Sequence, residues 1–151
     1  MKVLAFHIGP DRYGLPLGSI VRVLPLVELK QLPLTPGYVA GLLDLHGVHV
    51  PVIDLSLLAG LAPAALQFDT RIVIVDYRMD DGSTRALGLL AARVRGIEEL
   101  DQTMLADSGV RTAAFLGQVA SSAEGTLQLV ELAQLLTAEV RALLFPSGST
   151  A

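Results

Sequence analysis

The sequence predicts a mainly β fold built from a duplicated unit of about five short strands. Short runs rich in Val, Ile and Leu recur along the 151 residues, and Gly, Pro and Asp separate these runs. An internal repeat is the third observation. Small units of this kind protect their strand edges by closing, so we expect small barrels.

The first half of the chain is expected to hold two hairpins and a strand between them. The expected strands are Val3–Ile8, Tyr13–Leu17, the stretch around Ile20–Val23, Gly41–His46 and Val48–Ile53. Gly9-Pro10-Asp11 and Gly47 are the turn signals. Pro51 lacks a backbone donor, so its strand should be an edge or bulged there. Leu55–Leu58 is predicted to start a short helix, followed by a loop.

The second half repeats this organisation. Its expected strands are Arg71–Tyr77, Arg85–Val94 and Thr126–Val130, and Asp101–Arg111 is expected to be a loop. Asp80-Asp81-Gly82-Ser83 is a hairpin turn. Leucines at helical spacing predict a C-terminal helix over about 131–145, and the tail from Pro146 is expected to be disordered. We expect one domain, 1–151, with pseudo-symmetric halves at about 1–65 and 69–130.

Two separate segment pairs carry the repeat. Gly14–Leu26 resembles Gly88–Leu100, with matching glycines at the start. Val52–Leu55 corresponds to Leu129–Leu132. The glycine and the acidic residue are separated by 40 positions in the first half and 43 in the second. Chance similarity of short apolar strings is the alternative, but the similar spacing of two matches favours a duplication.

Composition excludes several classes of protein. The absence of cysteine rules out disulfides and fits a reducing, cytoplasmic location. The net charge is −4 and the basic residues are scattered, which does not favour nucleic-acid binding. Uncharged runs are shorter than the roughly 20 residues of a membrane span, and the N-terminus is unlike a signal peptide. The 52% of hydrophobic residues indicate a large core, exposed apolar patches for partners, or both.

The sequence offers little catalytic chemistry. His46 and His49 flank a turn, but residues three apart on a strand point to opposite faces, and only Asp44 and Asp54 lie near them. No serine has a nucleophile elbow, and no phosphate-binding glycine loop is present. Asp54 and Glu131 each end a strand and open a helix, so capping explains them better than paired catalysis. We therefore predict a protein without enzymatic activity, cofactor or metal.

Four motifs follow one another in a recognisable order. They are Phe6-x-Ile8-Gly9 with Tyr13-Gly14-Leu15, then Pro33-x-x-Pro36, Gly41-Leu42-Leu43-Asp44-Leu45-His46-Gly47, and Val50-Pro51-Val52-Ile53-Asp54-Leu55. On these motifs the chain resembles the CheW family, the adaptor proteins of bacterial chemosensory arrays. The resemblance covers about residues 2–145.

The resemblance implies two intertwined five-stranded β-barrels with SH3-like topology and no catalytic activity. It implies a protein that bridges the cytoplasmic tip of chemoreceptors to the regulatory domain of a CheA-type histidine kinase, without membrane insertion of its own. By the resemblance, Ile20 and Val23 form an apolar patch towards the kinase, Gly41 and Leu42 shape an adjoining groove, and Arg22 and His46 tune recognition. The alternative is that Ile20 and Val23 are core residues and His46 an inert surface residue.

The chain departs from the family pattern at charged positions. The family usually has Glu where this chain has Arg22, and Arg where it has His46; these two are thought to lie close together in typical members. The change alters the charge pattern that a partner meets. A specialised regulator or inhibitor that binds only one partner, in a dedicated motility, surface-sensing or cyclic-dinucleotide pathway, is therefore the alternative to a general adaptor.

Two other readings of the sequence lead to different classes. An input-binding module would hold a small ligand in the cleft between the barrels, but the sequence shows no convergent polar groups for it. The second alternative is that the chain is one domain of a longer kinase. The initial Met1 and the predicted helix near the C-terminus favour a free-standing adaptor instead.

Overall fold

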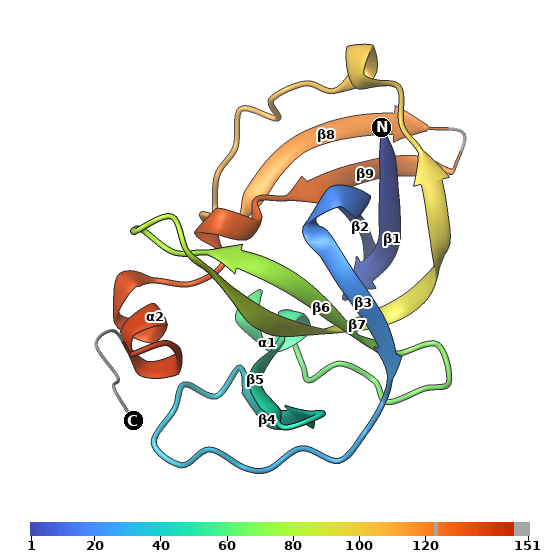
Figure 1. The fold of residues 1–151 in the computed structure, drawn as a ribbon. Helices are drawn as coiled ribbons and strands as arrows, with labels where there is room; N and C mark the ends of the chain where they lie inside the picture. Colours follow the sequence, from blue (N-terminus) through green and yellow to red (C-terminus); the bar gives the residue numbers. More distant parts are fainter. Residues whose placement is uncertain (123, 147–151) are drawn as a thin grey trace.

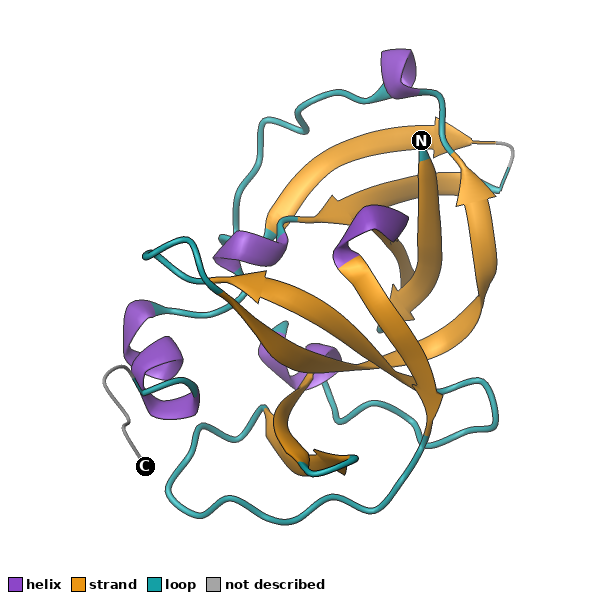
Figure 2. Ribbon diagram, in the orientation of Figure 1, coloured by secondary structure: helices purple, strands orange, loops and turns teal. Residues whose placement is uncertain are grey.

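The computed structural model describes residues 1–122 and 124–146, and within them the chain is mainly β, as predicted (Figures 1 and 2). The strands are β1 Lys2–Ile8, β2 Asp11–Pro16, β3 Ile20–Pro25, β4 Val39–Leu45, β5 Val48–Asp54, β6 Arg71–Arg78, β7 Thr84–Glu99, β8 Leu116–Ser122 and β9 Gly125–Val130. The helices are α1 Leu55–Leu58 and α2 Ala138–Leu144, with 3-10 turns η1 Leu17–Ser19, η2 Gln102–Met104 and η3 Leu132–Gln134. The tail expected to be disordered beyond Pro146 lies outside the described residues.

The strands form two five-stranded sheets that share β7. One has the order β7-β1-β2-β9-β8 and the other β3-β6-β7-β5-β4. The 16-residue β7 can serve both because its first part pairs with β6 as far as Ala91, and its last part pairs with β1 from Ala92 onwards. In Figure 1 this strand runs from the β6–β7 hairpin on the left through the centre of the molecule and then curves up its right edge.

Each sheet combines strands from both halves of the chain. In the parallel pairing of β2 with β9, Gly14 lies opposite Leu129. In the parallel pairing of β5 with β7, Val52 lies opposite Gly88. The two segments of each repeat are therefore separated, and each packs beside a segment of the other repeat. This exchange intertwines the two sheets.

Regular strand pairing among residues 1–122 and 124–146 does not close either sheet into a barrel. An isolated bridge between Lys30 and Leu42 spans the gap between the chain after β3 and β4. The equivalent bridge in the other sheet joins Ala106, which follows β7, to Val119 of β8. The two gaps are spanned in the same way, which agrees with a duplicated unit.

The largest hydrophobic cluster lies between the sheets and includes the C-terminal segment. Tyr77 is fully buried, its ring stacks on Phe145 at a centroid distance of 6.2 Å, and its hydroxyl donates to the carbonyl oxygen of Ala133 over 3.1 Å. Arg141 of α2 also pairs with Asp80 in the β6–β7 turn at 3.1 Å. These contacts hold the C-terminal segment against the β6–β7 hairpin.

Several elements differ from the sequence-based expectation. Strand β8 was not predicted, because Gly117, Gln118 and Ser121 have little strand propensity. The helix expected over about 131–145 consists of η3 and α2, because the Thr137 hydroxyl accepts from the Val140 amide at 3.2 Å and starts a new helix. Strand β7 continues past Val94 to Glu99.

The sequence predicted helix caps at Asp54 and Glu131 and an edge or bulge at Pro51, and the three outcomes differ. Asp54 caps α1, as predicted, by accepting from the amides of Ser56 and Leu57. Glu131 makes no side-chain cap bond to η3, so the prediction of capping was wrong there. Strand β5 is not an edge, but its pairing with β7 begins at Val52, so Pro51 is paired on one side only.

Candidate interaction surface

Strand β3 presents apolar side chains at an open edge of its sheet. Within the described residues β3 pairs with β6 alone, so its other edge has no neighbouring strand. Val21 is 56% exposed and Val23 is 41% exposed. Ile20 is half-buried and packs against the main hydrophobic cluster. Open edges with apolar side chains are sites where another protein can add contacts.

A bulge explains why consecutive β3 side chains are all exposed. The pairing shifts between Ile20, opposite Val75, and Arg22, opposite Ile74. The extra residue, Val21, interrupts the strict alternation of a strand. Val21, Arg22 and Val23 are therefore all exposed, with the arginine between two valines.

Gly41 allows the chain after β3 to lie against β4. Its φ is +150°, and a Cβ atom there would stand 2.7 Å from the carbonyl oxygen of Lys30. Beside it, the Lys30 amide donates to the Leu42 carbonyl at 2.9 Å, and the Leu42 amide donates to the Lys30 carbonyl at 2.7 Å. A side chain at position 41 would disrupt this bridge.

Leu42 lies in an apolar groove between β4, β5, the loop that precedes β4, and the end of α2. The groove has a volume of about 360 Å³ and is lined by Leu32, Pro33, Leu34, Thr35, Leu42, Pro51, Leu143 and Leu144. Leu34 is 99% exposed and has a positive φ of 61°. Of these residues, sequence reasoning assigned only Leu42 to the site. The apolar tripeptide Leu32-Pro33-Leu34, which lies in a loop, was the sequence signal that could have indicated this groove.

His46 lies in the turn between β4 and β5. Both His46 and Gly47 have positive φ, 52° and 88°, as a tight two-residue hairpin turn requires. The Asp44 carboxylate accepts from the Gly47 amide at 2.8 Å and stabilises the turn. No hydrogen bond or ion pair joins His46 to Arg22 in the part of the chain that the structure describes. The structure thus places the predicted residues on β3, on β4 and in the β4–β5 turn, where β3 and β4 are the outer strands of one sheet and the chain after β3 is bridged to β4.

Two kinds of feature are absent from the described residues, a metal-binding cluster and a membrane-spanning helix. No group of three His, Asp or Glu side chains among residues 1–122 and 124–146 could hold a metal ion. No helix in the same ranges is long and apolar enough to cross a membrane. An open apolar edge and an apolar groove are typical of surfaces that bind another protein, and they point to an interaction scaffold built on two intertwined β sheets.

Comparison with known proteins agrees with this class. The CheW-like domain family model matches residues 2–140, and the chain belongs to this family. It is 24% identical to the chemotaxis protein CheW of Klebsiella aerogenes over 148 residues, covering 94% of this chain and 85% of that protein. It is 32% identical to chemotaxis protein CheW of Helicobacter pylori over 77 residues, covering 51% of this chain and 47% of that protein.

A solved structure gives the same picture of the fold. The scaffolding protein TtCheW from Thermoanaerobacter tengcongensis superposes with a TM-score of 0.80 at 25% identity, covering 92% of this chain and 89% of that one. Membership of the family confirms the prediction of a non-catalytic adaptor in chemosensory signal transduction.

Proposed function

We propose that this protein couples chemoreceptors to a CheA-type histidine kinase, with the regulatory domain of the kinase and the cytoplasmic tip of the receptor as its two partners. We assign partner binding to the open edge of β3, because Val21 and Val23 are exposed there beside Arg22. An apolar patch of this kind on a scaffold without a reaction centre is typical of protein–protein contacts. A cytoplasmic location at receptor arrays follows from these partners.

The two partners are assigned to two parts of the surface. The exposed valines of β3 contact the kinase regulatory domain, and the groove around Leu42 contacts the receptor. Gly41 supports the groove indirectly, because it permits the bridge between Lys30 and Leu42. Arg22, which contributes a positive charge on β3, and His46, in the β4–β5 turn, select among partners.

Reconstitution with the kinase and receptor fragments from the same genome tests the coupling. Binary and ternary complexes are measured by size-exclusion chromatography, and kinase autophosphorylation is followed in parallel. A ternary complex with changed kinase activity is the expected result. Binding to only one partner would contradict coupling and identify a specialised regulator or inhibitor.

The assignment of β3 has its own test. Val23→Asp should weaken kinase binding at least tenfold, which is about 1.4 kcal/mol, because it places a charge in an apolar contact. Val110→Asp is the matched control, since Val110 is 57% exposed in a loop outside this surface. Ile20→Asp is a poorer choice because Ile20 packs on the core. Equal kinase binding by both valine variants would remove β3 from the interface.

A further inference from the structure

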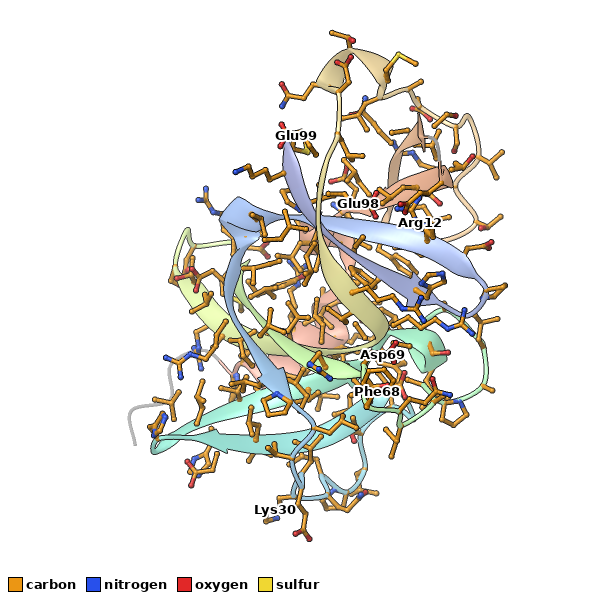
Figure 3. The ribbon with its side chains drawn as sticks, turned by 90° about the vertical axis from the view of Figure 1, so that its right-hand side faces the viewer. Arg12, Lys30, Phe68, Asp69, Glu98 and Glu99 are labelled. Atoms are coloured by element: carbon orange, nitrogen blue, oxygen red, sulfur yellow. The ribbon has the colours of Figure 1, made fainter. Side chains whose placement is uncertain are left out.

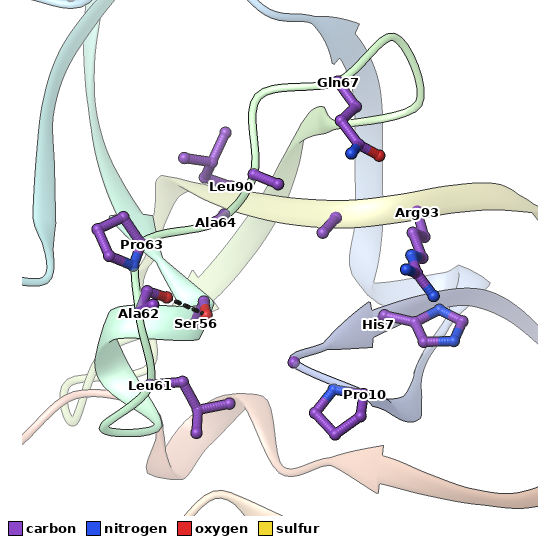
Figure 4. A pocket seen from close by; sticks show the side chains of 13 residues that line it. His7, Pro10, Ser56, Leu61, Ala62, Pro63, Ala64, Gln67, Leu90 and Arg93 are labelled. Atoms are coloured by element: carbon purple, nitrogen blue, oxygen red, sulfur yellow. Dashed lines mark hydrogen bonds between the residues drawn. The ribbon is translucent and has the colours of Figure 1, made fainter.

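We propose that the cavity at the junction of the two sheets is a binding site for a small organic carboxylate with an apolar body. The cavity has a volume of about 290 Å³, at the lower end of the size of small-molecule sites. One end is apolar, formed by Leu61, Pro63 and Leu90, and the other carries His7 and Arg93, with Pro10 beside His7. Figure 4 shows these two groups facing each other across the opening.

The apolar wall is held in place before any ligand binds. The loop after α1 is fixed because the Asp54 carboxylate accepts from the Ala64 amide at 3.1 Å and the Ser56 hydroxyl donates to the Ala62 carbonyl. Gly9, with a φ of +60°, lies so close to Leu61 that a Cβ atom would stand 2.5 Å from its Cδ1. A preformed wall reduces the conformational entropy that the protein loses when a ligand binds.

At the polar end, His7 has an unsatisfied atom. Its Nδ1 is buried and has no hydrogen-bond partner among the described residues. Buried nitrogen atoms almost always have a partner, so this exception leaves the hydrogen bonding of the polar end incomplete within the protein. In Figure 4 the side chain of Arg93 extends towards the ring of His7. A carboxylate at this end of the cavity would accept from the Arg93 guanidinium and lie beside the His7 ring.

The backbone of Arg93 adopts a conformation that is uncommon for its residue type. Arg93 has a φ of +51°. It lies where β7 passes from one sheet to the other, since His7 pairs with Ala92 while Ala5 pairs with Gly96. The surplus residues of β7 form a bulge, and this bulge directs the Arg93 side chain to the cavity. Strained positions with a functional side chain are a recurrent feature of binding sites.

The local charge favours an anion. The charged groups that face His7 are Arg93 and Arg95 from β7, and Arg12 and Asp11 from β2. Two of the arginines already have carboxylate partners: Arg12 pairs with Glu98 and Glu124, as Figure 3 shows for Glu98, and Arg95 pairs with Asp69 at 3.4 Å. Arg93 has no carboxylate within ion-pair distance in residues 1–122 and 124–146. Of these three arginines, Arg93 is therefore the one that can form an ion pair with the carboxylate of a ligand.

The protonation state of His7 should respond to the ligand. Burial, followed by the charges of Arg93, Arg12 and Arg95, holds the pKa of His7 below its usual value of 6.5. A carboxylate beside the ring would favour the protonated imidazole, which donates from both nitrogen atoms. Ligand binding and proton uptake by His7 are thus linked, and affinity should rise as pH falls.

The test compares benzoate with benzamide, its neutral analogue of nearly the same shape, and with inorganic phosphate. Each is titrated into the full chain at about pH 6 and about pH 8, while the ring signals of His7 are followed by NMR; this range spans the usual histidine pKa. We expect saturable shifts with benzoate, affinity at least tenfold weaker at the higher pH, and affinity at least tenfold weaker for benzamide. Arg93→Gln should weaken benzoate binding at least tenfold, and Arg78→Gln, at an exposed site on β6, should not.

Three results would overturn the proposal. One is the absence of saturable His7 shifts with benzoate. Another is equal affinity for benzoate and benzamide in the parent protein, a comparison that stands even if Arg93→Gln fails to fold. The third is tighter binding of phosphate than of benzoate, which would mean that the apolar wall of the cavity does not contribute to ligand affinity.

Discussion

Gly88 of β7 lies directly opposite Val52 of β5, and a Cβ atom on Gly88 would stand 2.9 Å from the Cγ2 atom of Val52. A similar close approach occurs in the other sheet, where Gly14 lies opposite Leu129 and a Cβ atom on Gly14 would stand 3.0 Å from the Cδ2 atom of Leu127, two residues earlier on β9. Both glycines mark places where strands from different repeats approach closely. The pairing of the repeats therefore depends on the missing side chain at these two positions.

Gly88→Ala should lower the free energy of unfolding by about 1–3 kcal/mol, because an extra methyl group overpacks a buried contact. Its neighbours include Ile72 at 3.3 Å as well as Val52, and all are buried. Chemical denaturation followed by circular dichroism measures the change. Gly18→Ala is the control, since nothing lies within 4 Å of its Cβ position, and it should be close to neutral. Equal stability of the two variants would show that the contact at Gly88 relaxes freely.

Asp54→Ala should destabilise the protein by about 2–3 kcal/mol, because charge-assisted hydrogen bonds to a buried carboxylate are strong. The side chain is 4% exposed and accepts from the amides of Ser56, Leu57 and Ala64. Glu131→Ala is the matched control at the equivalent position of the repeat. Glu131 is exposed and makes no cap bond, so a change below about 0.5 kcal/mol is expected there. Similar losses in both variants would contradict the difference between the two halves.

Phe145→Ala should cost about 3–5 kcal/mol, as is usual for truncation of a buried aromatic ring. Phe145 is 4% exposed, stacks on Tyr77, and has the Arg85 guanidinium 5.3 Å from its ring centroid. Leu143→Ala, two residues earlier, removes a side chain that is 59% exposed and should change stability little. Thermal unfolding of both variants measures how much the buried ring and the exposed leucine of this segment each contribute to stability. Similar melting temperatures would mean that the segment is not held by its aromatic contact.

The sequence predicted the strands whose residues have strong β propensity, and the structure confirms them. It also predicted the repeat of Gly14 with Gly88, and of Val52 with Leu129. Which segment lies beside which could not be read from the repeat, because each glycine packs against the other copy. The exchange was expected only through the family resemblance.

The site was predictable only in part, for a similar reason. Leu42 and Gly41 belong to a sequence motif, but Leu143 reaches the same groove from the end of the chain. The cavity beside His7 depends on Arg93, whose position results from a bulge between strands. Neither a bulge nor a contact across the chain leaves a periodic pattern in the sequence.

The free energy of unfolding should decrease as pH falls from about 7 to about 5, because His7 is harder to protonate in the folded protein. Burial and the neighbouring arginines lower its pKa in the folded state from the usual 6.5. As pH falls through 6.5, the unfolded chain takes up a proton that the folded chain does not, and stability is lost until pH passes below the folded pKa. His7→Gln cannot titrate, so its stability should vary less with pH over this range, whatever its absolute stability. Urea denaturation of both proteins at several pH values measures the two slopes. Parallel slopes would mean that His7 is protonated as easily in the folded chain as in the unfolded chain.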